Sequence, residues 1–193
     1  TGRYMCFGCG AKGDVFTFVQ QMEHLDFVGS VERIASKAGI ELRYTSGAGN
    51  GERKHRKELQ ALMERAVDWY HARLLESPDA RAAREYLRDR GLAGDVARSF
   101  RLGWAPDEWD ALSTSLGATP AMLAEVGLGF VNKAGRLQDS FRARVMFPIF
   151  DENGAAVAFG GRILPGSTDP AKYKNSTETP VYVKSRTLYG LNW

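Results

Sequence analysis

Hydrophobic positions in the first 44 residues follow the period of two short helices. Asp14 and Asp26 each precede a run of apolar residues spaced three and four positions apart, and the second run ends at Gly39. A carboxylate at the N-cap accepts hydrogen bonds from the first helical turn, and glycine is common just past a helix C-terminus. The predicted elements are a strand end at residues 3–5, helices at 15–22 and 27–38, and a short strand at 40–44.

The middle of the chain predicts a linker followed by several helices. Residues 45–51 are rich in glycine and poor in apolar side chains, which is typical of an interdomain linker. Ser77-Pro78 predicts a helix start because proline is favoured in the first turn, and Gly91 predicts the end of that helix. The predicted elements are a linker over residues 45–57 and helices at 57–75, between Ser77 and Gly91, and at 94–100, 107–116 and 120–126.

After Gly127 the pattern changes to that of strands. Two apolar runs, residues 145–150 and 155–159, flank Asp151-Glu152-Asn153-Gly154. This predicts a hairpin, because Asn-Gly tolerates the positive φ of a tight turn. We also predict an interruption at Gly160-Gly161, a loop over residues 165–180, and a strand followed by a turn or short helix over 181–191. The fold class is therefore α+β: a strand with two helices, a linker, then helices followed by a mixed or antiparallel sheet.

The composition excludes a disordered chain. The 193 residues are 44% hydrophobic and 25% charged, with a formal net charge of +3. No stretch approaches the roughly 20 apolar residues of a membrane span, and the N-terminus lacks a signal-peptide pattern. We therefore expect a cytoplasmic protein without a membrane partner. Because the chain starts at Thr1 without methionine and ends at Trp193 just after an apolar run, we expect an internal fragment.

The motif Cys6-x-x-Cys9 predicts half of a zinc site. Two thiolates three positions apart on a turn can bind one tetrahedral ion, and such a pair is not a disulfide framework. A structural zinc needs four ligands, and the chain has two cysteines. We expect the other two ligands upstream of Thr1. His24 as a third ligand, and two free cysteines in a turn, remain as alternatives.

Basic side chains concentrate in the C-terminal third, where residues 131–193 carry nine basic and five acidic residues. Arg142 and Arg144 share strand parity, so we predict that they face the same side. Arg162 follows two glycines, which allow another backbone or a nucleic-acid strand to approach closely. Cations beside an aromatic ring and an amide suit a single strand, because phosphates pair with cations and a base stacks on the ring. The residues concerned are Arg142, Arg144, Arg162, Lys172, Lys174, Lys184 and Arg186, together with Tyr173 and Asn175.

Several enzyme classes lack their defining residues in this sequence. There is no glycine-rich loop followed by Lys-Ser or Lys-Thr, and no Gly-x-Ser-x-Gly nucleophile elbow. The few carboxylates after residue 131 form no close pair on a predicted strand, so the chain does not supply a two-metal polymerisation site.

A series of short motifs occurs along nearly the whole chain except the linker. They are Tyr4-Met5-Cys6-Phe7-Gly8-Cys9-Gly10, Gly13-Asp14-Val15-Phe16-x-Phe18-Val19, Ala38-Gly39-Ile40, Tyr86-Leu87, Arg90-Gly91-Leu92, Leu102-Gly103-Trp104-Ala105-Pro106, residues 142–148, Phe159-Gly160-Gly161-Arg162, Lys172-Tyr173-x-Asn175-Ser176, Glu178-Thr179-Pro180 and Lys184-Ser185-Arg186-x-Leu188-Tyr189-Gly190-Leu191. This ordered series resembles bacterial replicative DNA primases of the DnaG type. It resembles the end of their zinc-binding domain and the start of their RNA-polymerase core.

The resemblance implies a nucleotidyltransferase that synthesises short RNA primers on single-stranded DNA template at the replication fork. It implies that an upstream Cys-x-x-His completes a structural Zn²⁺ site with Cys6 and Cys9. It also implies a Toprim subdomain beyond Trp193 that carries the catalytic carboxylates with Mg²⁺ or Mn²⁺, so this chain alone contains no catalytic residue and is expected to be inactive. The implied partners are template DNA, ribonucleoside triphosphates, the RNA primer and, through a separate C-terminal domain, the replicative helicase.

The resemblance also implies domain boundaries and a basic ridge. Residues 1–44 would be the C-terminal part of the zinc-binding domain, 45–57 the linker, and 58–193 the N-terminal basic subdomain of the polymerase core. The loop from Arg162 to Lys172 is slightly longer than usual for the family. The ridge positions that would bind template and nucleotide are Arg90, Arg142, Arg144, Arg162, Lys172, Asn175 and Lys184.

Two alternatives of other classes remain open. One is a non-catalytic module that binds single-stranded nucleic acid and carries a zinc knuckle; a carboxylate-rich continuation after Trp193 would exclude it. The other is a zinc-ribbon protein-interaction domain, which would not bind nucleic acid.

Overall fold

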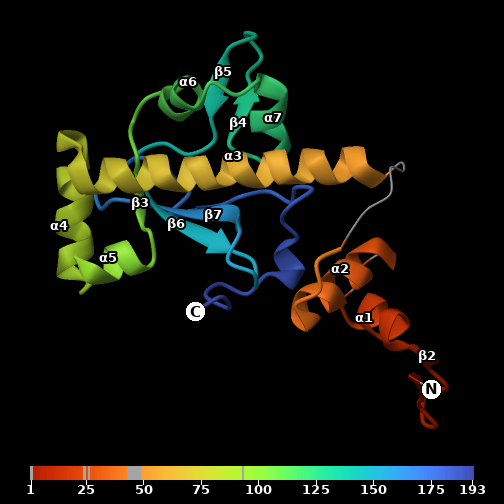
Figure 1. Cartoon of the computed structure of the whole chain (residues 1–193). Helices are drawn as coiled ribbons and strands as arrows, with labels where there is room; N and C mark the ends of the chain where they lie inside the picture. Colours follow the sequence, from red (N-terminus) through yellow and green to blue (C-terminus); the bar gives the residue numbers. More distant parts are fainter. Residues whose placement is uncertain (1, 24, 26, 43–48, 93) are drawn as a thin grey trace. The chain divides into compact units, whose positions relative to one another are not determined.

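The computed structural model describes residues 2–23, 25, 27–42, 49–92 and 94–193 (Figure 1). The chain forms two compact units, residues 1–48 and residues 49–193, which we call unit 1 and unit 2 and describe separately. Within the described residues, no helix combines the length and the apolar character needed to cross a membrane.

Unit 1 consists of a small hairpin and two helices. Strands β1 (Arg3–Met5) and β2 (Lys12–Asp14) pair antiparallel, and α1 (Val15–Glu23) and α2 (Phe27–Ala38) follow. The predicted cap of the first helix is confirmed, because the Asp14 carboxylate accepts hydrogen bonds from the backbone N–H of Thr17 at 2.8 Å and from its hydroxyl at 2.9 Å. Gly39, at φ +66°, ends α2 as predicted.

Several predictions for unit 1 were wrong. Strand β2, which pairs in register with β1, was not predicted. A strand was predicted at residues 40–44, but residues 40–42 are not in a strand. Phe27 is 60% exposed, although its place in the apolar run of the second predicted helix implies that it faces inward. His24, the predicted cap Asp26 and residues 43–48 lie outside the described residues.

Unit 2 begins with a 28-residue helix, α3 (Gly49–Glu76). The helix starts eight residues before the predicted start, so residues 49–57, which we expected to be linker, are helical. Polar residues such as Glu52 and Lys54 do not oppose helix formation. The predicted start was later because it rested only on the apolar positions that follow residue 57. The remaining elements before the main strands are η1 (Pro78–Ala80), α4 (Arg81–Asp89), α5 (Asp95–Ser99), β3 (Gly103–Ala105), α6 (Ala111–Leu116), α7 (Pro120–Glu125), β4 (Gly129–Val131) and β5 (Leu137–Asp139).

The sheet of unit 2 has four antiparallel strands in the order β3-β6-β7-β8. Strands β6 (Arg144–Phe150) and β7 (Ala156–Ile163) form the predicted hairpin, with Gly154 at φ +80° in its turn. Strand β8 is Tyr173–Asn175, and the 3₁₀ helix η2 is Lys184–Arg186. In Figure 1, α3 crosses the sheet, and the β4–β5 hairpin lies with α6 and α7 on the other side of that helix. The α+β class is confirmed.

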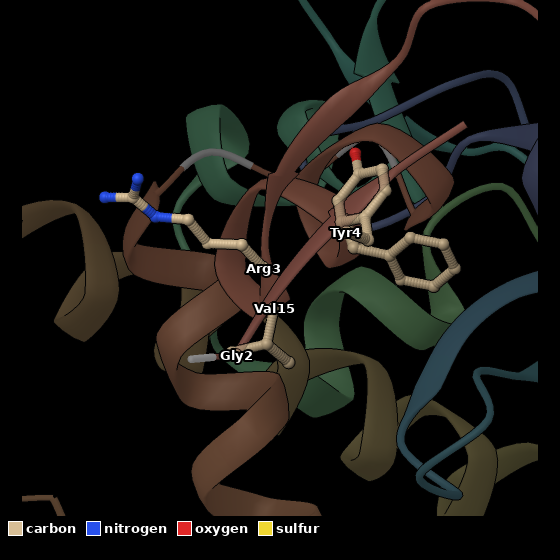
Figure 2. A pocket seen from close by; sticks show the side chains of 5 residues that line it. Gly2, Arg3, Tyr4 and Val15 are labelled. Atoms are coloured by element: carbon tan, nitrogen blue, oxygen red, sulfur yellow. The ribbon is translucent and has the colours of Figure 1, made fainter. Parts of the chain in front are cut away.

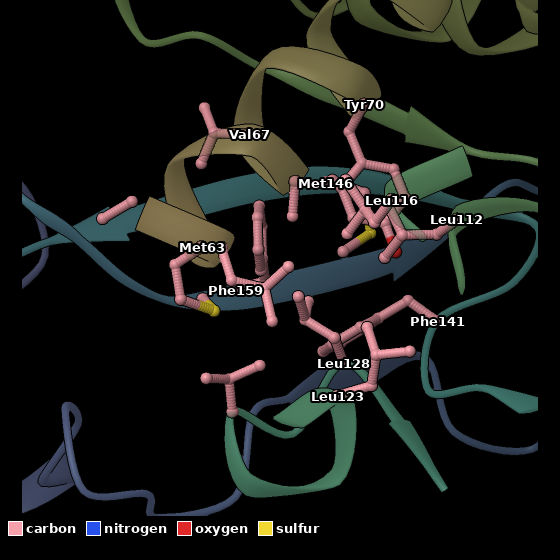
Figure 3. Close-up of a cluster of buried hydrophobic side chains, with 14 of the residues drawn as sticks. Met63, Val67, Tyr70, Leu112, Leu116, Leu123, Leu128, Phe141, Met146 and Phe159 are labelled. Atoms are coloured by element: carbon pink, nitrogen blue, oxygen red, sulfur yellow. The ribbon is translucent and has the colours of Figure 1, made fainter. Parts of the chain in front are cut away.

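The larger hydrophobic core lies where α3 covers one face of the sheet. Met63, Val67 and Tyr70 of α3 pack with Met146 and Phe159 of the sheet (Figure 3). Leucines 112, 116, 123 and 128, from α6, α7 and the following turn, extend the same cluster. A second cluster covers the opposite face and includes Leu74, Leu87, Trp104 and Val145.

Three predictions for the C-terminal segment need correction. Strand β7 continues through Gly160-Gly161 without interruption, because both glycines keep their pairing with β6 and β8. The predicted loop contains β8, which is too short and too polar to show an apolar alternation. Residues 181–191 contain an isolated bridge at Tyr182 and η2 in place of the predicted strand.

Candidate nucleic-acid interface and metal half-site

Strand pairing distributes the predicted ridge residues over two faces of the sheet. Arg162 lies opposite Tyr173, and Gly160 lies opposite Asn175, across β7 and β8. Positions two apart in a strand share a face, so Arg162, Tyr173 and Asn175 are on one face. This is the face of Trp104 and Val145, which α4 and α5 cover in part.

Three cations and two tyrosines meet at this face; we call them the cation–tyrosine cluster. The Arg90 guanidinium carbon lies 4.9 Å from the Tyr86 ring centroid. The Arg162 guanidinium carbon lies 5.7 Å from the same ring and 4.8 Å from the ring of Tyr173. The Lys172 ammonium lies 6.0 Å from the Tyr173 ring. All four contacts are in the range of cation–π attraction.

The C-terminus of α4 places Tyr86 and Arg90 beside the sheet. The two residues are four positions apart and therefore share a side of the helix. Arg90 is the C-cap, and Gly91 follows at φ +70°, a conformation in which glycine has no steric penalty. The Leu92 N–H bonds back to the Leu87 carbonyl at 2.8 Å, which closes the helix end.

No carboxylate among the described residues neutralises the positive charge of the cluster. Within the described parts of the chain, no ion pair involves Arg90, Arg162 or Lys172. Arg162 is only 9% exposed, and its Nε has no hydrogen-bond partner among the described residues. Tyr173 is 65% exposed. The cluster can therefore attract phosphates and offer a ring for stacking.

The prediction that Arg142 and Arg144 face the same side is wrong. Ala143 between them has φ +48°, which breaks the strand alternation, and Arg142 precedes β6. Arg142 forms an ion pair with Asp107 at 2.9 Å, and its guanidinium carbon lies 3.4 Å from the centre of the Trp109 ring.

Arg144 is almost completely buried, with 2% exposure. Its guanidinium forms an ion pair with Asp169 at 2.6 Å and donates to the Ala171 carbonyl at 2.8 Å. A β-carbon on Gly161 would lie 3.0 Å from Arg144 Cδ. The absence of a side chain at Gly161 therefore makes room for the side chain of Arg144. The partners of Arg144 thus anchor the loop between β7 and β8.

The remaining candidates lie in different environments. Lys174 faces away from the cluster, donates to the Ser140 carbonyl at 2.6 Å, and has its pKa lowered by burial and by the nearby Arg144. The Asn175 side chain lies close to Gly160, since a β-carbon there would be 3.2 Å from Asn175 Oδ1. Lys184 is exposed in η2, and no described contact joins it to the cluster.

Sequence reasoning did not assign a role to Tyr86 or Trp109. The four-residue spacing of Tyr86 and Arg90 on a predicted helix was a usable signal for the first of these contacts. The contact between Trp109 and Arg142 joins residues 33 positions apart, so no local pattern could indicate it.

Cys6 and Cys9 lie in the turn that joins β1 to β2, as predicted, and both thiols are free and exposed. The N–H groups of Cys9 and Gly8, together with the Cys9 thiol, lower the pKa of Cys6. A lowered thiol pKa suits a metal ligand, because thiolate is the binding form. In the described ranges no three His, Cys, Asp or Glu side chains group as a metal site. Two thiols on one turn match half of the four ligands of a structural zinc site.

A shallow hollow of about 300 Å³ lies beside this hairpin in unit 1 (Figure 2). Arg3 and Tyr4 line it together with Val15 and Phe18 of α1. Tyr4 packs edge-on against Phe18 at 5.4 Å and donates a hydrogen bond to Gln21 at 3.0 Å. These contacts join the hairpin to α1.

Comparison with known protein families gives two matches that together cover most of the chain. The family described as "DNA primase catalytic core, N-terminal domain" matches residues 69–193. The family described as "CHC2 zinc finger" matches residues 1–50.

Individual relatives agree with these matches. A DNA primase of Pseudomonas putida is 42% identical over 97% of this chain, which spans 29% of that protein's length. A solved DnaG primase catalytic domain bound to single-stranded DNA is 40% identical, with a TM-score of 0.67 over 72% of this chain and 45% of its own. The zinc-binding and RNA-polymerase domains of the Aquifex aeolicus primase are 30% identical, with a TM-score of 0.62 over 99% of this chain and 45% of theirs.

Proposed function

The chain belongs to the family of DnaG-type bacterial DNA primases, and from that premise we propose that it supplies the template- and nucleotide-binding part of an enzyme that synthesises RNA primers during DNA replication. The observation that carries this proposal is the cation–tyrosine cluster, whose charge has no carboxylate partner in the described parts of the chain. The protein would act on chromosomal DNA in the cytoplasm.

In this proposal the cluster follows the backbone of single-stranded template. Arg90, Arg162 and Lys172 neutralise phosphates, and Tyr173 provides a ring on which a base stacks. Support comes from the related catalytic domain whose solved structure contains single-stranded DNA. Asn175 on the same face of β8, and Lys184 in η2, remain proposed contacts for the template or for the triphosphate of a ribonucleotide.

We leave Arg144 out of the proposed contact set. Its burial and its ion pair with Asp169 support a role in anchoring the loop that precedes β8. Arg142 stays a proposed contact of a different kind, because its guanidinium lies over the 60%-exposed ring of Trp109, away from the cluster.

We propose that residues 1–44 are the C-terminal part of a zinc-binding domain and that residues 58–193 are the N-terminal subdomain of the polymerase core. Cys6 and Cys9 would supply two thiolate ligands to a structural Zn²⁺, with the other ligands outside this chain. The ion would tie the β1–β2 turn to the rest of that domain.

Phosphoryl transfer to a growing RNA depends on positioning and on neutralisation of charge by metal ions. We propose that the carboxylates for Mg²⁺ or Mn²⁺ lie in a Toprim subdomain outside this chain, which spans 45% of the related two-domain structure. The contribution of the present residues is then to orient template and nucleotide before the transfer. The RNA primer and a replicative helicase are the further proposed partners.

Salt-dependent binding of this chain to fluorescent single-stranded DNA tests the proposal. Each neutralised phosphate changes the slope of log affinity against log salt by about −0.7, so three to five contacts give roughly −2 to −3.5. Lys172→Ala or Lys184→Ala should reduce the magnitude of the slope by about one contact and weaken all sequences alike.

Lys133→Ala is the matched control, because Lys133 is an exposed lysine in the β4–β5 turn, away from the cluster. It should leave the slope unchanged. Anisotropy that shows no binding by the unaltered chain at low salt would contradict the proposed function. Equal slopes for the unaltered chain and both lysine variants would mean that the template does not pass Lys172 and Lys184, and would move its path toward Arg84 and Arg88 of α4.

A further inference from the structure

The ring of Tyr86 lies within 6 Å of two guanidinium groups, those of Arg90 and Arg162. The two arginines come from distant parts of the chain, one from the end of α4 and the other from β7. Two like charges near one point repel each other, so something has to offset that cost if both are to stay in place. The described neighbourhood of both guanidinium groups contains no ion-pairing carboxylate, which leaves the tyrosine rings as their partners.

Two other arginines of unit 2 are positioned by carboxylates. Arg101 donates to the carboxylates of Glu64 and Asp68, and Arg144 to that of Asp169. A carboxylate orients a guanidinium but also neutralises it and occupies its donors. An aromatic ring attracts the cation through its quadrupole and leaves both the charge and the N–H donors available to a phosphate.

The Tyr86 ring is itself anchored. Tyr86 is half-buried and packs against the core cluster that contains Leu87 and Trp104. The contacts thus run from the core through Tyr86 to Arg162 and on to the exposed ring of Tyr173. The buried Nε of Arg162, for which the described residues provide no hydrogen-bond partner, lies within this arrangement.

We infer that Tyr86 is a positioning residue of the nucleic-acid site: its ring fixes Arg90 and Arg162 side by side, uncompensated, in the places where they meet template phosphates. This inference rests on the proposed function and adds a residue that contacts no nucleic acid itself. It predicts that binding depends on the ring of Tyr86 and not on its hydroxyl.

The first test compares Tyr86→Leu with Tyr86→Phe in binding to a single-stranded DNA oligonucleotide. Leucine keeps most of the apolar contact with the core but has no ring, and loss of two cation–π contacts should weaken binding about five- to thirty-fold. Phenylalanine retains the quadrupole and should restore affinity to within about twofold of the unaltered chain.

A double-mutant cycle separates positioning from a general loss of structure. Arg90→Ala should cost less in the Tyr86→Leu background than in the unaltered chain, with a coupling of about threefold or more. Arg142→Ala is the matched control, because its guanidinium lies over Trp109, and it should show no coupling to Tyr86.

Each outcome bears on a defined claim. If the unaltered chain binds DNA and Tyr86→Leu binds equally well, the positioning role is wrong and the proposed function stands. The positioning role is also wrong if Tyr86→Phe does not restore binding, or if Arg90 and Arg142 show equal coupling to Tyr86. If the unaltered chain does not bind DNA at all, the proposed function itself fails.

Discussion

The role of each arginine in unit 2 depends on the group that its guanidinium contacts. Arg144 is buried and has the Asp169 carboxylate and a backbone carbonyl as partners, so it stabilises the sheet and its loop. Arg162 is the penultimate residue of the neighbouring strand and is also buried, yet its partners are rings. Among the described residues, the second arrangement leaves the guanidinium without a carboxylate partner.

Replacing Asp169 by asparagine should change the acid sensitivity of the protein. The N–H of Ala171 and the guanidinium of Arg144 lower the pKa of Asp169 below its ordinary value. A carboxyl whose folded pKa is depressed contributes stability that is complete above its unfolded pKa, about 4, and disappears as the pH falls through the folded pKa. Asp169→Asn should therefore be less stable than the unaltered chain at pH 7, and the two should converge at low pH.

Thermal unfolding midpoints measured between pH 7 and pH 2 check this expectation. Glu178→Gln, which alters an exposed carboxylate, is the control and should follow the unaltered chain throughout. A constant difference between Asp169→Asn and the unaltered chain at every pH would contradict the assignment.

At the scale of the elements, Gly103 marks a close contact between β3 and α3. A β-carbon at Gly103 would lie 2.5 Å from Tyr70 Cβ and 3.0 Å from the Tyr70 backbone carbonyl carbon. Neither atom belongs to a flexible side-chain end, so the neighbour cannot move aside cheaply. The glycine thus allows the strand to lie directly against the helix, and Tyr70 to reach Phe159 on the sheet with ring centroids 5.3 Å apart.

Gly103→Ala should lower the free energy of unfolding by about 1–3 kcal/mol, the usual cost of overpacking a close-packed core. Gly51→Ala in the same unit is the matched control, because nothing lies within 4 Å of a β-carbon there and Gly51 is part of α3. It should be neutral or stabilising by up to about 1 kcal/mol. The free energies of unfolding of both variants are measured with urea. Equal values for the two would contradict the expectation and show that Tyr70 and β3 can move apart without cost.

At the scale of the whole molecule, the chain combines two units that serve different parts of one proposed reaction. Unit 1 carries the cysteine pair, and unit 2 carries the cation–tyrosine cluster. Neither unit, within its described residues, groups three His, Cys, Asp or Glu side chains in a way that could hold a metal ion. Two-metal phosphoryl transfer requires such a group.

Because we propose that the catalytic carboxylates lie in a Toprim subdomain outside this chain, we expect that the chain binds single-stranded DNA but does not incorporate ribonucleotides. Incubation with template DNA, all four ribonucleoside triphosphates and Mg²⁺ should give no RNA product above background. A complete primase of the family, assayed in parallel, shows that the conditions support synthesis. Template-dependent RNA from homogeneous chain would mean that the active site lies within these 193 residues.

Part of the site could be predicted from the sequence because the relevant signals are local. The Cys6-x-x-Cys9 turn, the Asp14 cap and the Asn153-Gly154 hairpin each follow from a few neighbouring residues whose conformational preferences are strong. The start of α3 was placed too late because polar helical residues carry no hydrophobic period. Strands β2, β3, β4, β5 and β8 were missed because three residues are too few to show an alternation of apolar and polar positions.

The sequence by itself determined the α+β class, the hairpin at Asn153-Gly154, the turn that carries the cysteine pair, and the basic character of the C-terminal third. The tertiary structure alone decided how those cations are used, because a guanidinium's partners come from residues distant in the chain. The positive φ of Ala143 separates Arg142 from Arg144, and the pairing of β7 with β8 sets Tyr173 beside Arg162. The packing of α4 against the sheet then adds Tyr86, so a ring and not a carboxylate becomes the partner of two arginines.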